Sequence, residues 1–158
     1  MRRSRCRCAG SRLSTGAGRL RLALLPRVAL LSLLLVGPAW AGFDDARRAY
    51  SRGDYAAAYR EWRALAEGGD PAAQFMVGFM HERGQSVVPD LGEAVTWYRR
   101  AALQGDLHAQ FRLGFLYAYG RGVERDDAQA AEWYTRAAEQ GNAAARAALE
   151  QLRAEGRA

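Results

Sequence analysis

The sequence predicts an all-α fold, a solenoid of antiparallel helix pairs, and two observations support this prediction. The first is an internal repeat: Asp70 to Gly105 and Asp106 to Gly141 align over 36 residues without a gap and are identical at 17 positions. The second is that apolar residues recur at helical spacing within each repeat. A fixed period of this size is typical of solenoids, in which each unit buries its apolar face only against its neighbours.

The chain has a formal net charge of +6, but this charge is unevenly distributed. Eight of the 23 basic residues precede residue 28, whereas all 17 acidic residues follow residue 43. Residues 42 to 158 therefore hold 15 basic and 17 acidic side chains, a formal net charge of −2. This part of the chain lacks the basic excess that favours nucleic acids, and we expect no nucleic-acid partner.

Residues 1–41 have the three parts of a secretory signal peptide. An arginine-rich start precedes an apolar run from Val28 to Val36, and Gly37-Pro38 leads to Ala39-Trp40-Ala41. The nine-residue run is too short for a membrane span of roughly 20 residues, and Ala-x-Ala is a cleavage pattern. We expect cleavage between Ala41 and Gly42, no stable membrane insertion afterwards, and a periplasmic or secreted protein of a Gram-negative bacterium. The alternative is an uncleaved anchor.

Residues 42–69 are predicted to form a degenerate opening repeat. A first helix is expected from Phe43 to Arg52, and Asp54 can cap a second helix from Tyr55 to Glu67. The apolar residues of this second helix recur at helical spacing: Ala58, Trp62 and Leu65. A shift of 36 residues places Asp54 on Asp90, which relates this segment to the repeats that follow.

The repeats at 70–105 and 106–141 each predict a helix pair. Asp70 caps a helix that opens with Pro71 and ends at Gly84, and its core face comprises Ala73, Val77 and Met80. Asp90 caps the partner helix, Leu91 to Leu103, whose packing side comprises Ala94, Tyr98, Ala101 and Ala102. The third repeat follows the same plan from Asp106.

Two glycines and a final helix complete the prediction. Gly78 and its counterpart Gly114 lie inside helices, where glycine costs roughly 1 kcal/mol relative to alanine, so we expect a close helix crossing at both. Ser86 replaces the second glycine of the loop Gly120-Arg121-Gly122, which predicts a stiffer turn. Residues 142–158 are expected to cap the stack with a helix from Ala143 to Arg153, its Arg146 and Glu150 facing outward.

The third repeat resembles the Sel-one-like repeat, a relative of the tetratricopeptide repeat. The matching residues include Ala109, Leu113-Gly114, Tyr117, Gly120, Gly122-Val123, Asp126, Ala130, Trp133-Tyr134, Ala137-Ala138 and Gly141. The second repeat departs from the pattern at Val77, His81 and Ser86. The resemblance covers residues 43 to 141 and implies a right-handed superhelix used as a protein-binding scaffold. It implies no particular partner.

The residue inventory limits the chemistry that the chain can perform. There is no lysine, and both cysteines, Cys6 and Cys8, lie in the leader, so neither a Schiff base nor a thiol nucleophile is expected after residue 41. His81 and His108 are the only histidines, and Ser51 and Ser86 the only serines after residue 41. We predict a packing role for His81, no catalytic residue, no metal site and no cofactor.

An aromatic stripe is the candidate binding surface. Phe75, Phe79 and Arg83 lie away from the core face of one helix, and Phe111, Phe115 and Tyr119 take the same places in the next repeat. By the tetratricopeptide resemblance this stripe lines a concave groove, where aromatic rings with an arginine suit a peptide ligand. The alternative is that the phenylalanines are core. Trp97-Tyr98 and Trp133-Tyr134 are assigned to packing between repeats.

These observations predict a monomeric, non-enzymatic scaffold that binds a peptide or protein partner in the cell envelope. One alternative is a periplasmic cell-wall or β-lactam-related hydrolase, because some secreted relatives have been proposed to bind or cleave β-lactams. The other is a structural subunit of an envelope complex. The sequence does not separate a peptide-binding scaffold from a structural subunit.

Overall fold

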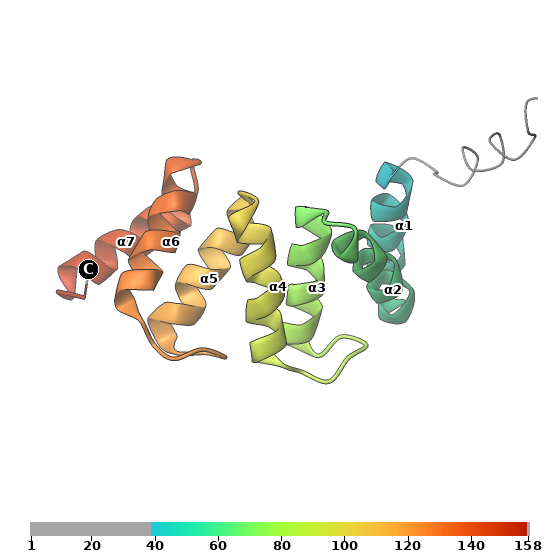
Figure 1. Ribbon diagram of the computed structural model, residues 1–158, viewed down its shortest axis with the longest axis horizontal. Coiled ribbons are helices and arrows are strands. Elements are labelled where there is room, and N and C mark those ends of the chain that lie inside the picture. Colours follow the sequence, from blue (N-terminus) through green and yellow to red (C-terminus); the bar gives the residue numbers. More distant parts are fainter. Residues whose placement is uncertain (1–38, 158) are drawn as a thin grey trace, which may run out of the picture. The chain divides into compact units, whose positions relative to one another are not determined.

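The structure, a computed structural model, describes residues 39–157, and every regular element in that range is an α-helix. Figure 1 shows the seven helices following one another in chain order from α1 to α7. Their bounds are α1 Ala39–Ser51, α2 Tyr55–Glu67, α3 Pro71–Arg83, α4 Leu91–Leu103, α5 Leu107–Tyr119, α6 Asp127–Glu139 and α7 Ala143–Ala154. These elements confirm the predicted all-helical solenoid.

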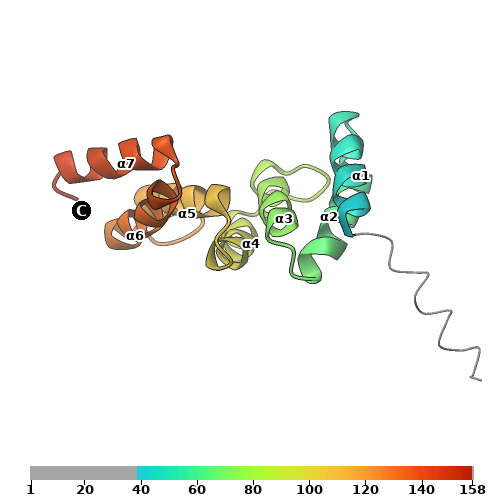
Figure 2. The same cartoon turned by 90° about the horizontal axis from the view of Figure 1, so that it is seen from above.

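The helices pack mainly against their neighbours in the sequence. The closest associations are within the pairs α1–α2, α3–α4 and α5–α6, and the pairs are joined by α2–α3, α4–α5 and α6–α7 contacts. Figures 1 and 2 show this side-by-side order from two directions. A few contacts between α5 and α7 continue the pattern into the final helix. Each pair therefore buries its apolar surface against adjacent pairs, as in other solenoids.

Most helix boundaries agree with the predicted ones, and α1 is the exception. It begins at Ala39, four residues before Phe43, so the predicted cleavage site between Ala41 and Gly42 lies in its first turn. Cleavage there would remove three residues of the helix. The rest of the predicted signal peptide, residues 1–38, lies outside the described part of the chain.

Side-chain caps set the starts of the helices. The Asp70 carboxylate accepts a hydrogen bond from the Ala73 amide at 2.7 Å, and Asp106 accepts one from Ala109 at the same distance. Helices α2, α4, α6 and α7 are capped in the same way, by Asp54, Asp90, Asp126 and Asn142. Each cap satisfies an amide that has no partner within its helix.

The core consists of three buried clusters along the stack. Ala73, Val77 and Met80, the predicted core face of α3, are each 0% exposed. Trp97 belongs to the cluster that α3 shares with α1 and α2, whereas its neighbour Tyr98 belongs to the cluster shared with α5. The adjacent aromatic residues of one helix thus belong to different clusters, because residues next to each other on a helix point about 100° apart.

The loop after α3 keeps a positive φ where its counterpart has a glycine. Ser86 has a φ of 66°, close to the 73° of Gly122. The serine thus adopts the left-handed conformation that L-residues generally avoid. This turn therefore carries a local conformational cost that the corresponding turn of the third repeat avoids. The stiffness of this turn stays a prediction.

Among the described residues, no helix is both long enough and apolar enough to cross a membrane.

Candidate protein-binding surface

The aromatic stripe is built from the first helix of each of the two repeated pairs, α3 and α5. We define it as Phe75, Phe79 and Arg83 on α3 together with Phe111, Phe115 and Tyr119 on α5. The residues are spaced by four positions on each helix, so each set lies along one side of its helix. The caps at Asp70 and Asp106 fix where both helices start, which gives the two sets the same register.

The four phenylalanines are half-buried, whereas Arg83 and Tyr119 are exposed. On α3, the Phe75 ring lies 5.5 Å from the Tyr98 ring and 5.6 Å from the His108 ring of the next repeat, measured between centroids. Phe79 follows Phe75 at 6.3 Å in a stacked arrangement. These rings therefore serve packing on one side, and their partial exposure leaves the other side accessible.

Guanidinium groups cover the outer aromatic rings. Arg83 lies 4.7 Å from the centroid of Phe79, and Arg112 and Arg121 lie 5.5 and 5.9 Å from that of Phe115. Tyr119 adds a ring 4.7 Å from Phe115. Such arrangements are stabilised by the attraction between a cation and the ring face. The stripe thus combines apolar area with positive charge.

The glycines inside α3 and α5 allow the partner helices to approach. A Cβ at Gly78 would lie 2.9 Å from the Tyr98 ring, and a Cβ at Gly114 would lie 2.5 Å from the Tyr134 ring. Any side chain at these positions would displace the tyrosines. Trp97, Tyr98, Trp133 and Tyr134 are at most 7% exposed, so all four lie in the packed interior of the stack.

A partly buried ion pair between α3 and α5 was not predicted from the sequence. Glu82 of α3 has a side chain only 6% exposed, and both of its oxygens accept hydrogen bonds from Arg112 of α5, at 3.0 and 2.8 Å. The Tyr98 hydroxyl donates to the same carboxylate at 2.8 Å. Burial and the charge of Glu82 raise the pKa of Tyr98. The repeat alignment could not indicate this site, because Ala118 stands at the position of Glu82 and Met76 at that of Arg112.

Paired glutamines form a second feature that sequence reasoning missed. The Gln74 amide donates to the carbonyl of Ala66, and Gln104 donates to Gln74 at 2.8 Å. Gln110 and Gln140 repeat this arrangement one repeat later, with Gln110 donating to the carbonyl of Ala102. The glutamine is identical between the repeats at both positions, Gln74 with Gln110 and Gln104 with Gln140. This identity could have indicated a shared hydrogen bond. These bonds tie each helix pair to the end of the preceding one.

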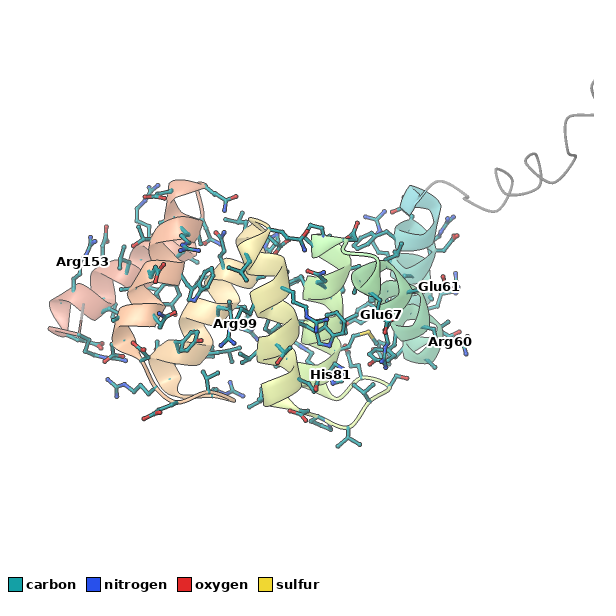
Figure 3. All side chains as sticks on the ribbon, in the orientation of Figure 1. Arg60, Glu61, Glu67, His81, Arg99 and Arg153 are labelled. Atoms are coloured by element: carbon teal, nitrogen blue, oxygen red, sulfur yellow. The ribbon has the colours of Figure 1, made fainter. Side chains whose placement is uncertain are left out.

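His81 takes a structural position between α2 and α3. Its Nε2 lies 3.1 Å from the Tyr59 hydroxyl, and the two rings meet edge to face. Figure 3 places His81 on α3 and Arg99 on α4. In the third repeat, Tyr117 stands at the position of His81. Arg99 of α4 donates a hydrogen bond to the Tyr117 hydroxyl at 2.6 Å, so this residue too is bonded to the preceding helix pair. The contacts of His81 are those of a packing residue.

A cluster of charges fastens the segment that follows α7. Arg157 contacts both oxygens of Asp127, at 3.1 and 2.7 Å, and donates to Glu155 at 2.7 Å and to the Ala118 carbonyl at 2.8 Å. Arg125 binds the other side of Asp127 at 2.9 Å. The hydrogen bonds from Arg157 and Arg125 hold the pKa of Asp127 well below its usual range.

The described residues contain no assembled hydrolytic or metal site. The Ser51 hydroxyl donates to the Arg48 carbonyl rather than to a histidine. Across residues 39–157, no three histidine, cysteine, aspartate or glutamate side chains are grouped so that they could hold a metal ion.

The fold defines the class of the chain: an α-solenoid of repeated helix pairs. The Sel1 repeat family profile matches residues 71–106 and 107–142, one residue later than the period counted from Asp70. Residues 71–142 therefore form two Sel1 repeats, in agreement with the resemblance of the sequence.

Two solved structures show the same fold. One is c5321, a protective antigen present in uropathogenic Escherichia coli strains displaying an SLR fold, with 36% identity and a TM-score of 0.71; the match covers 75% of this chain and 26% of that chain. The other is a Sel1 repeat protein from Oxalobacter formigenes, with 31% identity and a TM-score of 0.70, covering 79% of this chain and 55% of that chain. This chain thus spans about a quarter and about half of the two proteins. No curated protein sequence matches it.

Proposed function

We propose that the chain is a non-enzymatic scaffold that binds a peptide or protein partner on the aromatic stripe. Sel1 repeats generally serve as protein-interaction scaffolds, and two of them make up residues 71–142. The observation that carries the proposal is the arrangement of half-buried rings on α3 and α5 beneath the exposed guanidinium groups of Arg83 and of Arg121, which lies in the loop after α5. Aromatic residues and arginine dominate the binding energy of many protein interfaces.

The stripe is suited to binding because its shape is fixed before a partner arrives. Phe75 is held by Tyr98 and His108, and Phe111 by the Tyr134 ring 5.8 Å away. Binding to such rings costs little side-chain conformational entropy, since their rotamers are already restricted by packing. The exposed members, Arg83 and Tyr119, add contacts at the edge of the surface.

Affinity capture from a native periplasmic extract tests this proposal. The bait is the chain from Gly42 onward, compared with Arg83→Glu/Tyr119→Ala on the stripe and with Arg153→Glu/Leu103→Ala as a control. All four side chains are exposed, so both variants should melt at the temperature of the unmodified bait. We expect the control to retain the partner and the stripe variant to lose it. Equal retention by both variants would overturn the assignment of the stripe.

We also propose that the protein acts in the periplasm after removal of its leader. This rests on the Val28–Val36 run followed by Ala39-Trp40-Ala41. Amino-terminal sequencing of the protein from the envelope of the producing cell should begin at Gly42. A first residue upstream of Val28 would favour the uncleaved anchor instead.

A further inference from the structure

Charge is divided unequally between the two helices of each repeat. Helices α4 and α6 carry four acidic residues: Glu93, Asp127, Glu132 and Glu139. Helices α3 and α5, which hold the aromatic stripe, carry only Glu82, whose side chain is 6% exposed and paired with Arg112. Residues 42–158 have a formal net charge of −2, so positive charge at the stripe is a local property of these two helices.

Three guanidinium groups lie over two phenylalanine rings of the stripe. Phe79 and Phe115 pack against the same buried cluster, although they belong to different repeats. Arg83 lies 4.7 Å from the centroid of the Phe79 ring, and Arg112 and Arg121 lie 5.5 and 5.9 Å from that of Phe115. The stripe therefore offers apolar surface and positive charge side by side.

Two of these guanidinium groups have no carboxylate partner. Within residues 39–157, the side chains of Arg83 and Arg121 are exposed and form no ion pair. A guanidinium whose face covers a ring keeps its N–H groups at the edge, where their fork matches a carboxylate. Arg112 shows both contacts at once, because it covers Phe115 while its Nε and Nη2 donate to the Glu82 oxygens at 3.0 and 2.8 Å.

We propose that the segment of the partner that binds the stripe is acidic, with a large apolar side chain beside its carboxylates. The apolar side chain packs on Phe79 and Phe115, and the carboxylates bind Arg83 and Arg121. A basic segment would meet three like charges and no accessible carboxylate on α3 or α5. This inference rests on the proposed function and deepens it by naming the chemistry of the partner.

Selection from a phage library of short random peptides tests this proposal on the full chain. A soluble peptide of residues 1–38, added in excess, removes phages that bind the arginine-rich leader. We expect the selected peptides to be enriched in aspartate and glutamate next to aromatic or large aliphatic residues. Selected peptides without this acidic enrichment, or a library that yields no binding peptide, would overturn the proposal.

Charge reversal locates the site at which the selected peptides bind. Arg83→Glu/Arg121→Glu should weaken the tightest peptide by about tenfold or more, because arginines beside aromatic rings dominate many interfaces. Arg146→Glu/Arg153→Glu makes the same change in net charge at exposed positions of α7 and should have a much smaller effect. Equal losses in the two variants would refute binding at the stripe. If the first variant does not fold, Arg83→Gln/Arg121→Gln replaces it.

Two other occupants of the stripe would give different results. Binding to vesicles of phosphatidylglycerol that Arg83→Glu/Arg121→Glu abolishes, with no acidic peptide selected, would replace the peptide by an anionic membrane surface. Self-association that the same variant abolishes, measured by analytical ultracentrifugation, would instead identify a second copy of the chain as the occupant. Either result would overturn the proposal of an acidic partner segment.

The outcome is separate from that of the capture experiment. If the selected peptides lack acidic residues while Arg83→Glu/Tyr119→Ala still loses the captured partner, the acidic chemistry is wrong and the proposed scaffold stands. If acidic peptides bind the stripe but that variant retains the captured partner, the stripe has the proposed chemistry and its assignment as the partner-binding surface is wrong.

Discussion

Ser86 is the residue at which sequence and backbone conformation disagree most directly. Its φ of 66° lies in the left-handed region, which costs L-residues roughly 1–2 kcal/mol. Ser86→Gly should therefore raise the free energy of unfolding, by at most about 1 kcal/mol. The relief of the left-handed conformation is partly offset by the larger entropy that glycine loses on folding. Urea denaturation measures this change.

The reverse substitution in the third repeat is the matched control. A Cβ at Gly122 would lie 2.6 Å from both the Cβ and the carbonyl oxygen of Leu91, so Gly122→Ser should destabilise the protein. A loss of stability in Ser86→Gly would show that the turn holds the serine without strain, because only the entropy cost of glycine would then remain.

Gly114 tests the close approach of α5 and α6. A methyl group at this position would lie 2.5 Å from the Tyr134 ring, so Gly114→Ala should destabilise the protein by about 1–3 kcal/mol through overpacking. Gly78→Ala should cost less, because its shortest contact is 2.9 Å. Thermal melting gives both values.

Helix propensity alone predicts that Gly114→Ala stabilises the protein, since alanine is more favourable than glycine in a helix by about 1 kcal/mol. Gly92→Ala, at an exposed position of α4, is the control for that effect and should be neutral or stabilising. Stabilisation by Gly114→Ala would contradict the packing account.

At the scale of helices, the Glu82–Arg112 pair joins α3 to α5 across α4. Glu82→Ala leaves the Tyr98 hydroxyl and the Arg112 guanidinium without their shared partner. Because the Arg112 side chain is 30% exposed, water can replace part of the lost interaction, and we expect a loss of about 1–3 kcal/mol.

A double-mutant cycle of Glu82→Ala and Arg112→Ala, measured by urea denaturation, separates the interaction energy of the pair from the effects of the individual substitutions. A coupling energy near zero would show that the two charges do not stabilise the stack through each other.

The attachment of the segment after α7 is expected to depend on pH. Hydrogen bonds from Arg157 lower the pKa of Asp127 and of Glu155 below their ordinary values. A carboxylate with a lowered pKa in the folded state stabilises the fold above its unfolded pKa, about 4, and this contribution is lost as the pH falls further. The protection factors of the α7 amides, which are exchange rates corrected for the intrinsic pH dependence of exchange, should therefore fall below about pH 4.

Asp127→Asn is the control for this pH effect. It removes the carboxylate at every pH, so the α7 protection factors should be lower at neutral pH and should change less on acidification. Identical pH profiles of the variant and the unmodified protein would exclude Asp127 as the group responsible.

At the scale of the molecule, the local signals of the sequence predicted most of the helices. Capping aspartates, Pro71 and the glycines after α3 and α5 act within a few residues, so they can be recognised in one dimension. The repeat itself indicated that each pair packs on the next. The same signals did not predict that α1 begins at Ala39, because the sequence has no serine, threonine, aspartate or asparagine immediately before it.

The contacts between repeats were harder to predict because they join residues about 30 positions apart. Glu82 meets Arg112 only when α3, α4 and α5 pack together, and neither residue recurs in the other repeat. The partial burial of Phe75 also depends on tertiary packing, since His108 and Tyr98 come from different helices. Helical periodicity therefore could not decide whether the phenylalanines of the stripe line a groove or belong to the core.

Site-specific photo-crosslinking in living cells tests the central claim, that the stripe contacts the partner. A photoreactive phenylalanine derivative replaces Tyr119, which is 56% exposed, or Leu103, which is 67% exposed and outside the stripe. The account predicts a discrete crosslinked product from position 119 and none from position 103. A product from position 103 with none from position 119 would show that the partner binds elsewhere on the solenoid.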